Sequence, residues 1–174
     1  TMVFKNIAYH GNTKFLLCML ILIFNSSFLQ NKAIKLGGAL EVDRCLKIII
    51  FKTIFLSNHA EDGGCISVHF SKYLLIQSVL LKACLAMDSG GSLFANNANV
   101  KAIIAIVNCV FNSNTAKISG AAIFIKMADH FILYGIQFNA RSNQPSTLIK
   151  LKVRYLNFKF VDVKNIAVDI RQLD

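Results

Sequence analysis

The chain has 174 residues and a formal net charge of +10, from 19 lysines and arginines against 9 aspartates and glutamates. Hydrophobic residues make up 55% and charged residues only 16%, which excludes a disordered chain and predicts one domain over residues 1–174 with a sizeable core. The basic residues are dispersed and accompany no recognised nucleic-acid-binding motif, which argues against nucleic acid as a partner. The charge favours acidic glycans or acidic protein surfaces instead.

The most hydrophobic run of the sequence is 15–24, FLLCMLILIF. Two interpretations are open for it. Lys5 and Lys14 precede the run, as they would the core of a secretory signal peptide. We favour a strand of a repeating fold, because similar apolar strands recur later in the chain. A membrane-spanning helix needs about 20 apolar residues, so we expect no transmembrane helix here.

Two landmarks recur together along the chain. The first is a large apolar residue, at Val3, Phe28, Phe55, Leu81, Phe111 and Phe138, with steps of 25, 27, 26, 30 and 27 residues. The second is an apolar residue that opens a strand, at Phe15, Leu40, Ile66, Leu93, Ile123 and Ile149, with steps of 25, 26, 27, 30 and 26 residues. Because the two sets of steps vary together, they mark one structural unit, and a fixed period of this length is typical of a solenoid.

The residues after each strand opening alternate in hydrophobicity. Ile66, Val68 and Phe70 are separated by single residues, as are Ile123, Ile125 and Met127. A period of two predicts β-strands rather than helices. The sequence therefore predicts an all-β fold, a right-handed parallel β-helix of about six coils of 25–30 residues.

In such a fold, equivalent residues of successive coils stack about 4.8 Å apart. We expect an internal ladder of large apolar residues and a second ladder of asparagines at a turn. The apolar ladder contains Phe28, Phe55, Leu81, Phe111 and Phe138, and the asparagine ladder contains Asn31, Asn58 and Asn114. Stacked amides can bond from coil to coil, so we assign both ladders a structural role.

A tetrad that begins with two small residues precedes most strand openings: Gly37–Leu40, Gly63–Ile66, Gly90–Leu93 and Gly120–Ile123. Together with the Phe-x-x-Asn motif, these tetrads resemble the repeats of chlamydial polymorphic outer membrane proteins. The resemblance covers roughly residues 3–155. It implies the pectin-lyase-like class of right-handed β-helix, a cell-surface or extracellular location, and a non-enzymatic role as a scaffold, an adhesin-like segment or a structural subunit of a larger assembly.

Neither end of the sequence shows a convincing cap, although solenoids need covered ends. We therefore expect a fragment of a longer chain or a part of an assembly. Other segments or subunits would then cover the open ends of the β-helix.

An enzyme that acts on polysaccharide is the alternative. Counting three residues past each strand opening places Asp43, His69, Asn96, Lys126 and Lys152 in one outward column. Asp43 and His69 could then act as an acid–base pair, with Lys126 and Lys152 binding an acidic sugar. A solvated outer face explains the same residues, and 9 carboxylate residues in the whole chain are few for such a site. The sequence lacks a CxxC pair and indicates no metal or other cofactor.

A basic strand near the C-terminus is a candidate site for an anionic ligand. Lys150, Lys152 and Arg154 alternate with apolar residues, so they share the outer face of a strand. Lys150 should stack on Phe124. We expect this patch to suit an acidic glycan or an acidic protein surface, although a solvated face also explains it.

The five cysteines leave at least one thiol unpaired within the chain. Cys18 and Cys45 each lie ten residues before a Phe landmark, which would stack them on neighbouring coils within the range of a disulfide. Counting forward from the strand openings puts them two residues out of register, so both arrangements stay open. We expect Cys65, Cys84 and Cys109 to be buried thiols that pack as small hydrophobic residues.

Overall fold

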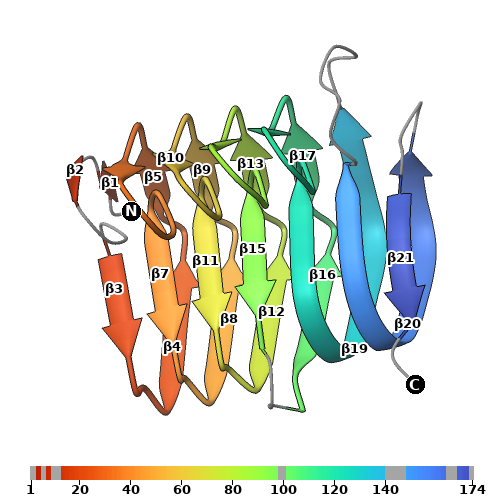
Figure 1. Ribbon diagram of the computed structural model, residues 1–174. Coiled ribbons are helices and arrows are strands. Elements are labelled where there is room, and N and C mark those ends of the chain that lie inside the picture. The colour runs from red at the N-terminus through yellow and green to blue at the C-terminus, as the bar shows by residue number, and fades with distance from the viewer. Residues whose placement is uncertain are drawn as a thin grey trace.

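The computed structural model describes residues 3–4, 7–8, 13–97, 101–139, 148–163 and 168–172. Within these residues all regular structure is β-strand, and the strands stack into a parallel solenoid (Figure 1). The predicted fold class is confirmed, with about five turns where the sequence predicted about six coils.

A regular turn of the solenoid consists of four short strands. The first strands of the chain are β1 (Val3–Phe4) and β2 (Ile7–Ala8). Four regular turns follow: β3 (Thr13–Leu16), β4 (Leu20–Phe24), β5 (Ser27–Leu29) and β6 (Lys32–Ala33); β7 (Leu40–Asp43), β8 (Lys47–Phe51), β9 (Ile54–Leu56) and β10 (His59–Ala60); β11 (Ile66–His69), β12 (Tyr73–Gln77), β13 (Leu80–Lys82) and β14 (Leu85–Ala86); β15 (Leu93–Asn96), β16 (Ile103–Val107), β17 (Val110–Asn112) and β18 (Thr115–Ala116).

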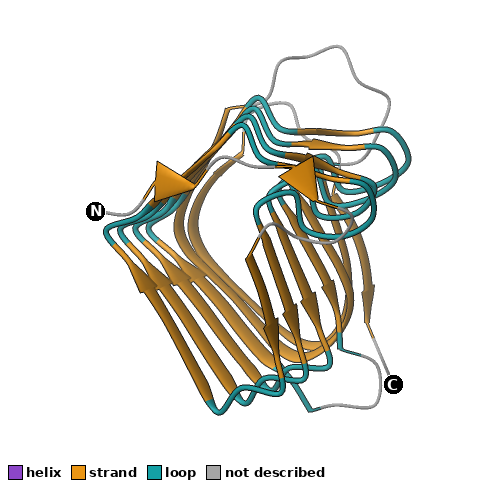
Figure 2. Ribbon diagram, turned by 90° about the vertical axis from the view of Figure 1, so that its left-hand side faces the viewer, coloured by secondary structure: helices purple, strands orange, loops and turns teal. Residues whose placement is uncertain are grey.

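Each strand pairs in parallel with the equivalent strands of the neighbouring turns. The strands β4, β8, β12 and β16 form one such column, and β6, β10, β14 and β18 form another. Figure 2 looks nearly along the stack and shows equivalent strands lined up behind one another, with the loops gathered at the corners. Equivalent residues therefore meet on every turn, as the repeat requires.

The corners of a regular turn are made by residues with positive φ. In the turn from β7 to β11 these residues are Arg44, Lys52, Ser57 and Gly63, at φ of 55°, 49°, 54° and 62°. The left-handed region redirects the chain within a single residue. At the fourth corner the residue is glycine in each of the four regular turns, because a Cβ on Gly63 would collide with the carbonyl of Ile66.

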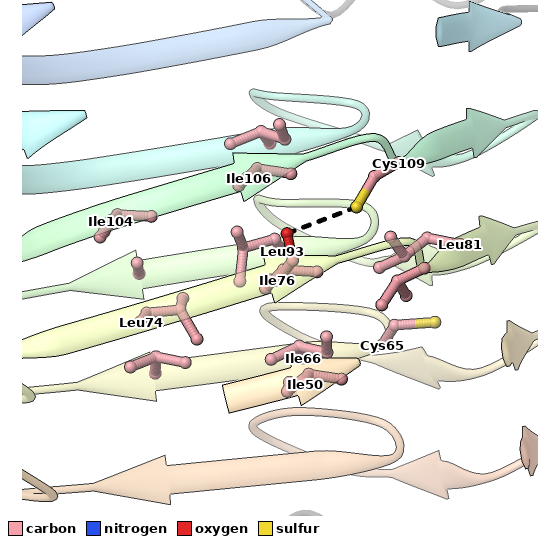
Figure 3. Close-up of a cluster of buried hydrophobic side chains, with 14 of the residues drawn as sticks. Ile50, Cys65, Ile66, Leu74, Ile76, Leu81, Leu93, Ile104, Ile106 and Cys109 are labelled. Atoms are coloured by element: carbon pink, nitrogen blue, oxygen red, sulfur yellow. Dashed lines mark hydrogen bonds between the residues drawn. The ribbon is translucent and has the colours of Figure 1, made fainter. Parts of the chain in front are cut away.

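The core is a set of apolar ladders inside the solenoid. Ile50, Ile76 and Ile106 lie above one another from β8, β12 and β16 (Figure 3). The aromatic ladder runs through Phe28, Phe55, Leu81, Phe111 and Phe138, all of them buried and in register. The rings of Phe28 and Phe55 stack with centroids 4.8 Å apart, and those of Phe111 and Phe138 with centroids 5.0 Å apart.

Asn58 and Asn114 each tie their own turn to the turn before it. The Asn58 Oδ1 atom accepts from the backbone N–H of Asn31 at 2.9 Å, and its Nδ2 donates to the carbonyl of Phe28 at 3.0 Å. Asn114 repeats this pattern, accepting from the N–H of Cys84 and donating to the carbonyl of Leu81, both at 2.9 Å. These amides satisfy backbone groups that would otherwise be buried without partners.

Two landmarks of the first repeat need correction. Phe4, not Val3, pairs with Phe28, and Thr13, not Phe15, pairs with Leu40. The run 15–24 contributes the end of β3 and the whole of β4, whose residues alternate between exposed and buried. The structure thus places this run as a strand of the solenoid.

The last turns differ from the regular ones. Strand β19 (Ile123–Asn139) has 17 residues and strand β20 (Ile149–Val163) has 15, and β20 pairs with the short β21 (Val168–Gln172). In Figure 1 both long strands sweep without a break round the bend that separates two strands in the regular turns. Gly135, at φ of 62°, keeps a left-handed residue inside β19.

Candidate functional site

A basic groove crosses the outer face of the three last strands. Its volume is about 120 Å³, and its lining is Phe124, Ile125, Lys126, Lys150, Leu151, Lys152, Asp169 and Arg171. Four of these side chains are cationic and one is anionic. We call the four cations, Lys126, Lys150, Lys152 and Arg171, the basic groove residues.

A β-bulge brings Lys126 into the groove. Strands β19 and β20 pair through Ile125 with Leu151 and again through Ala128 with Val153. Between these pairs β19 has two residues, Lys126 and Met127, where β20 has only Lys152. A bulge of this kind re-aims the extra side chain, and the Lys126 side chain is exposed beside Lys152.

Lys150 connects the cations to an aromatic surface. Its ammonium lies 5.9 Å from the centroid of the Phe124 ring, 3.3 Å from the Ser119 hydroxyl and 4.0 Å from the Asp169 carboxylate. The Phe124 ring stacks in turn on Phe94, with centroids 5.4 Å apart. The predicted stacking of Lys150 on Phe124 agrees with the pairing of these two residues.

The outer cations of the groove have few partners. Lys152 pairs in register with Arg171, so two cationic side chains lie on neighbouring strands. Both are exposed, and within the described part of the chain no carboxylate lies within ion-pair distance of either. The side chains of Lys126, Lys152 and Arg171 thus concentrate positive charge at the mouth of the groove, and a bound anion would relieve the repulsion.

Arg154, which the sequence grouped with Lys150 and Lys152, lies apart from them. Its guanidinium forms a 2.8 Å ion pair with Asp129. It lines a separate depression of about 310 Å³, together with Val153, Tyr155, Leu156 and Ile170. The structure therefore keeps Lys150 and Lys152 together, adds Lys126 and Arg171, and places Arg154 outside.

The column proposed for an acid–base pair is only partly formed. Asp43, His69 and Asn96 are in register on β7, β11 and β15. The next residue in the column is Met127 rather than Lys126, because the register of β19 shifts between the partners of Ala95 and Asn96. The expected column of five is corrected accordingly.

His69 is packed against its own sheet. Its Nε2 lies 2.7 Å from the hydroxyl of the buried Ser67, and its ring lies 5.6 Å from that of Phe94. Burial lowers the pKa of His69, although the carboxylate of Asp43 acts in the opposite direction. Burial against the sheet and the Phe94 ring therefore favours the neutral imidazole.

Cys65 and Cys84 were expected to be separate buried thiols, and this prediction is wrong. These two buried residues form a disulfide between neighbouring turns, with Cα atoms 5.6 Å apart, so they are not separate thiols. Cys84 occupies the asparagine position of its turn, and the ladder geometry brings it to the corner where Cys65 lies. Cys109 is a buried thiol as expected, and burial raises its pKa to about 11.

Cys18 and Cys45 lie on neighbouring turns. The backbone N–H of Cys18 donates to the Cys45 Sγ atom at 3.3 Å, and both residues are free thiols. The two counts from the sequence disagreed because the first strand opens at Thr13, five residues before Cys18, just as Leu40 lies five residues before Cys45. The structure thus selects the stacked arrangement.

Neither a metal-binding cluster nor a membrane-spanning helix occurs in the described ranges. These residues include no group of three or more His, Cys, Asp or Glu side chains placed to hold a metal ion. They also contain no helix with the length and apolar character needed to cross a membrane.

Comparison with known families supports the resemblance seen in the sequence. The sequence model that defines the family of Chlamydia polymorphic membrane protein repeats matches residues 108–126. These residues contain β17, β18 and the following Gly120–Ile123 tetrad. No curated protein and no solved structure matches the chain. The chain therefore contains a repeat similar to that of these proteins within a parallel β-solenoid, and this similarity favours an outer-membrane or surface location.

Proposed function

We propose that this chain is a non-enzymatic, adhesin-like β-solenoid segment of a surface protein, and that its basic groove binds acidic glycans. The single observation that carries the proposal is the convergence of Lys126, Lys150, Lys152 and Arg171 around the ring of Phe124. An acidic glycan presents both anionic groups and apolar sugar faces, and this groove offers a partner to each.

In this proposal the groove residues have different tasks. Lys150 is tied to Ser119 and Asp169, so it is held over Phe124 and contributes a fixed charge. Lys126, Lys152 and Arg171 are exposed and can close on carboxylates or sulfates. Arginine and lysine side chains of this kind bind such anions through charge-assisted hydrogen bonds.

Chromatography on immobilised heparin tests the proposal, since heparin is a strongly acidic glycan. We expect the triple variant Lys126→Ala, Lys152→Ala and Arg171→Ala to elute at clearly lower salt than the unaltered chain. The control is Lys35→Ala, Lys72→Ala and Lys82→Ala, which removes the same charge from exposed residues outside the groove. Equal losses of retention in the two triple variants would show that binding follows net charge, and the groove would be rejected as the site.

A further inference from the structure

The stacked thiols of Cys18 and Cys45 form a second cross-turn cysteine pair. Each follows the first strand of its turn, and the backbone N–H of Leu46 donates to the carbonyl of Cys18 at 2.8 Å, which fixes the two corners against each other. Neighbouring strands lie about 4.8 Å apart, within the range of Cα distances that a disulfide spans. The 3.3 Å contact from the Cys18 N–H to Cys45 Sγ already points one sulfur at the backbone of the other residue.

The two members of the pair differ in access to solvent. Cys18 is half-buried, whereas Cys45 is only 2% exposed. Burial raises the pKa of Cys45 to about 11, although the hydrogen bond from the Cys18 N–H acts in the opposite direction. Cys45 therefore has little tendency to react with a reagent from solution, and Cys18 is the accessible sulfur.

The pair also differs from Cys65 and Cys84. Both sulfur-bearing residues of that disulfide are wholly buried, so small thiols cannot reach it while the chain is folded. A bond at Cys18 would keep one sulfur at the surface, and accessible disulfides are the ones that exchange readily with thiols in solution. One cross-turn pair is thus built as a permanent link and the other as an exchangeable one.

From these contacts we infer that Cys18 and Cys45 are a reversible disulfide site, oxidised by a small disulfide such as oxidised glutathione and reduced by the corresponding thiol. The Cys18 thiolate attacks one sulfur of oxidised glutathione, its S–S bond breaks, and one glutathione leaves as a thiol after taking a proton. Cys45 then loses its proton to solvent and attacks the Cys18 sulfur, and the second glutathione leaves. Two protein thiols are oxidised and one glutathione disulfide is reduced to two thiols.

Formation of this bond would fasten the first two regular turns at the corner that joins β3 to β4 and β7 to β8. Strand β4 pairs with β8 alone among the described strands. Its outward side chains, Leu20, Leu22 and Phe24, are more than half exposed. A cross-link beside it would oppose separation of β4 from β8. The inference stands independently of the basic groove.

Peptide mapping of the intact chain in glutathione buffers of increasing oxidised fraction provides the test. After alkylation of free thiols and digestion without reduction, we expect a Cys18–Cys45 cross-linked peptide to replace the two alkylated peptides as the buffer becomes oxidising. Cys109 is the internal control, since it is buried with no cysteine beside it and should gain no glutathione while the chain is folded. Circular dichroism before quenching verifies that the chain is folded.

Single variants separate the two steps of the exchange. In Cys45→Ala, Cys18 should stop at the mixed disulfide with glutathione, whereas in Cys18→Ala, Cys45 should remain unmodified. Cys18→Ser and Cys45→Ser provide replacements if either alanine variant fails to fold. Persistence of a glutathione adduct on Cys18 in the unaltered chain, or alkylation of both cysteines in the most oxidising buffer, would overturn the inference.

Discussion

The regular turns and the last turns of this solenoid use the same strand pairing but turn their corners differently. From β7 to β11 the chain redirects itself at four single residues with positive φ. In β19 and β20 the strands continue round the equivalent bend, with a bulge at Lys126 and Met127 and a single left-handed residue, Gly135. The regular turns repeat one solution, and the last turns depart from it.

The difference teaches where a binding site can arise on a repeating fold. Exact repetition stacks similar residues on one another, which suits the phenylalanine and asparagine ladders. It also places similar side chains above one another on the outer surface. The bulge in β19 breaks this repetition, and Lys126 within it joins Lys152 and Arg171 in the lining of the groove. The regular turns therefore act as the scaffold, and the candidate site lies where the repeat is interrupted.

The largest expected effect of a single substitution lies in the aromatic ladder of the regular turns. Phe55 is wholly buried and stacked on Phe28, so Phe55→Ala should lower the free energy of unfolding by roughly 3–5 kcal/mol. Phe24→Ala is the matched control because its ring is 62% exposed. Urea denaturation of both variants measures the difference, and similar losses would contradict the internal position of the Phe55 ladder.

The second prediction compares a glycine of the regular turns with a glycine of the last turns. A Cβ on Gly64 would press against the carbonyls of Gly91 and Leu85 on the next turn, the latter at 2.5 Å, and backbone atoms cannot move aside. A Cβ on Gly135 would meet the Asn108 side chain, which is exposed and can rotate away.

We therefore expect Gly64→Ala to lower the free energy of unfolding by about 3 kcal/mol or more. Gly135→Ala should lower it by roughly 1–2 kcal/mol, which is the strain of a left-handed residue with a Cβ. Thermal or urea unfolding of the two variants tests the order. A larger loss for Gly135→Ala would show that the last turns are as tightly constrained as the regular ones.

The repeat made most of the fold predictable from the sequence. Phe28, Phe55 and Phe111 recur with a large apolar residue between them, and a parallel stack forces equivalent positions together. The first repeat was misjudged by one residue at Val3, whose neighbour Phe4 is also apolar, and by two at Phe15, because the strand opens at the polar Thr13. Period alone cannot choose between neighbours of the same character.

The candidate site was predictable only in part. The alternation of residues in β20 predicted that Lys150 and Lys152 share the outer face. The position of Lys126 depends on a β-bulge, and nothing in the local sequence predicts that bulge. Arg171 was missed, although the alternation of Val168 and Ile170 could have revealed its strand. The Cys65–Cys84 disulfide was missed because it joins two different positions of the repeat, and their distance depends on the path of the corner between them.

The smallest expected effect concerns charges that repetition brings close together in the regular turns. Asp62 lies half-buried with Glu61 beside it and Asp88 on the next turn, whereas in the last turns Lys150 faces Asp169 with the opposite charge. Burial first, and then the charge of Asp88, raises the pKa of Asp62 from 3.8 to about 6. The folded chain thus binds this proton more tightly than the unfolded chain, and its stability should fall as the pH rises from 3.8 to about 6.

Asp62→Asn removes this dependence while keeping an oxygen that can accept from the Ser89 N–H, now 3.1 Å from the carboxylate. We expect the variant to unfold at a higher urea concentration than the unaltered chain at neutral pH, and the difference to vanish in acid below the unfolded pKa. Asp88→Asn should lower the pKa of Asp62, because it removes the carboxylate that raises this pKa most. Nuclear magnetic resonance of the Asp62 carboxyl carbon can follow the change. If Asp62→Asn destabilised the chain equally at all pH values, the like charges of neighbouring turns would be screened by solvent, and repetition would carry no electrostatic penalty in this corner.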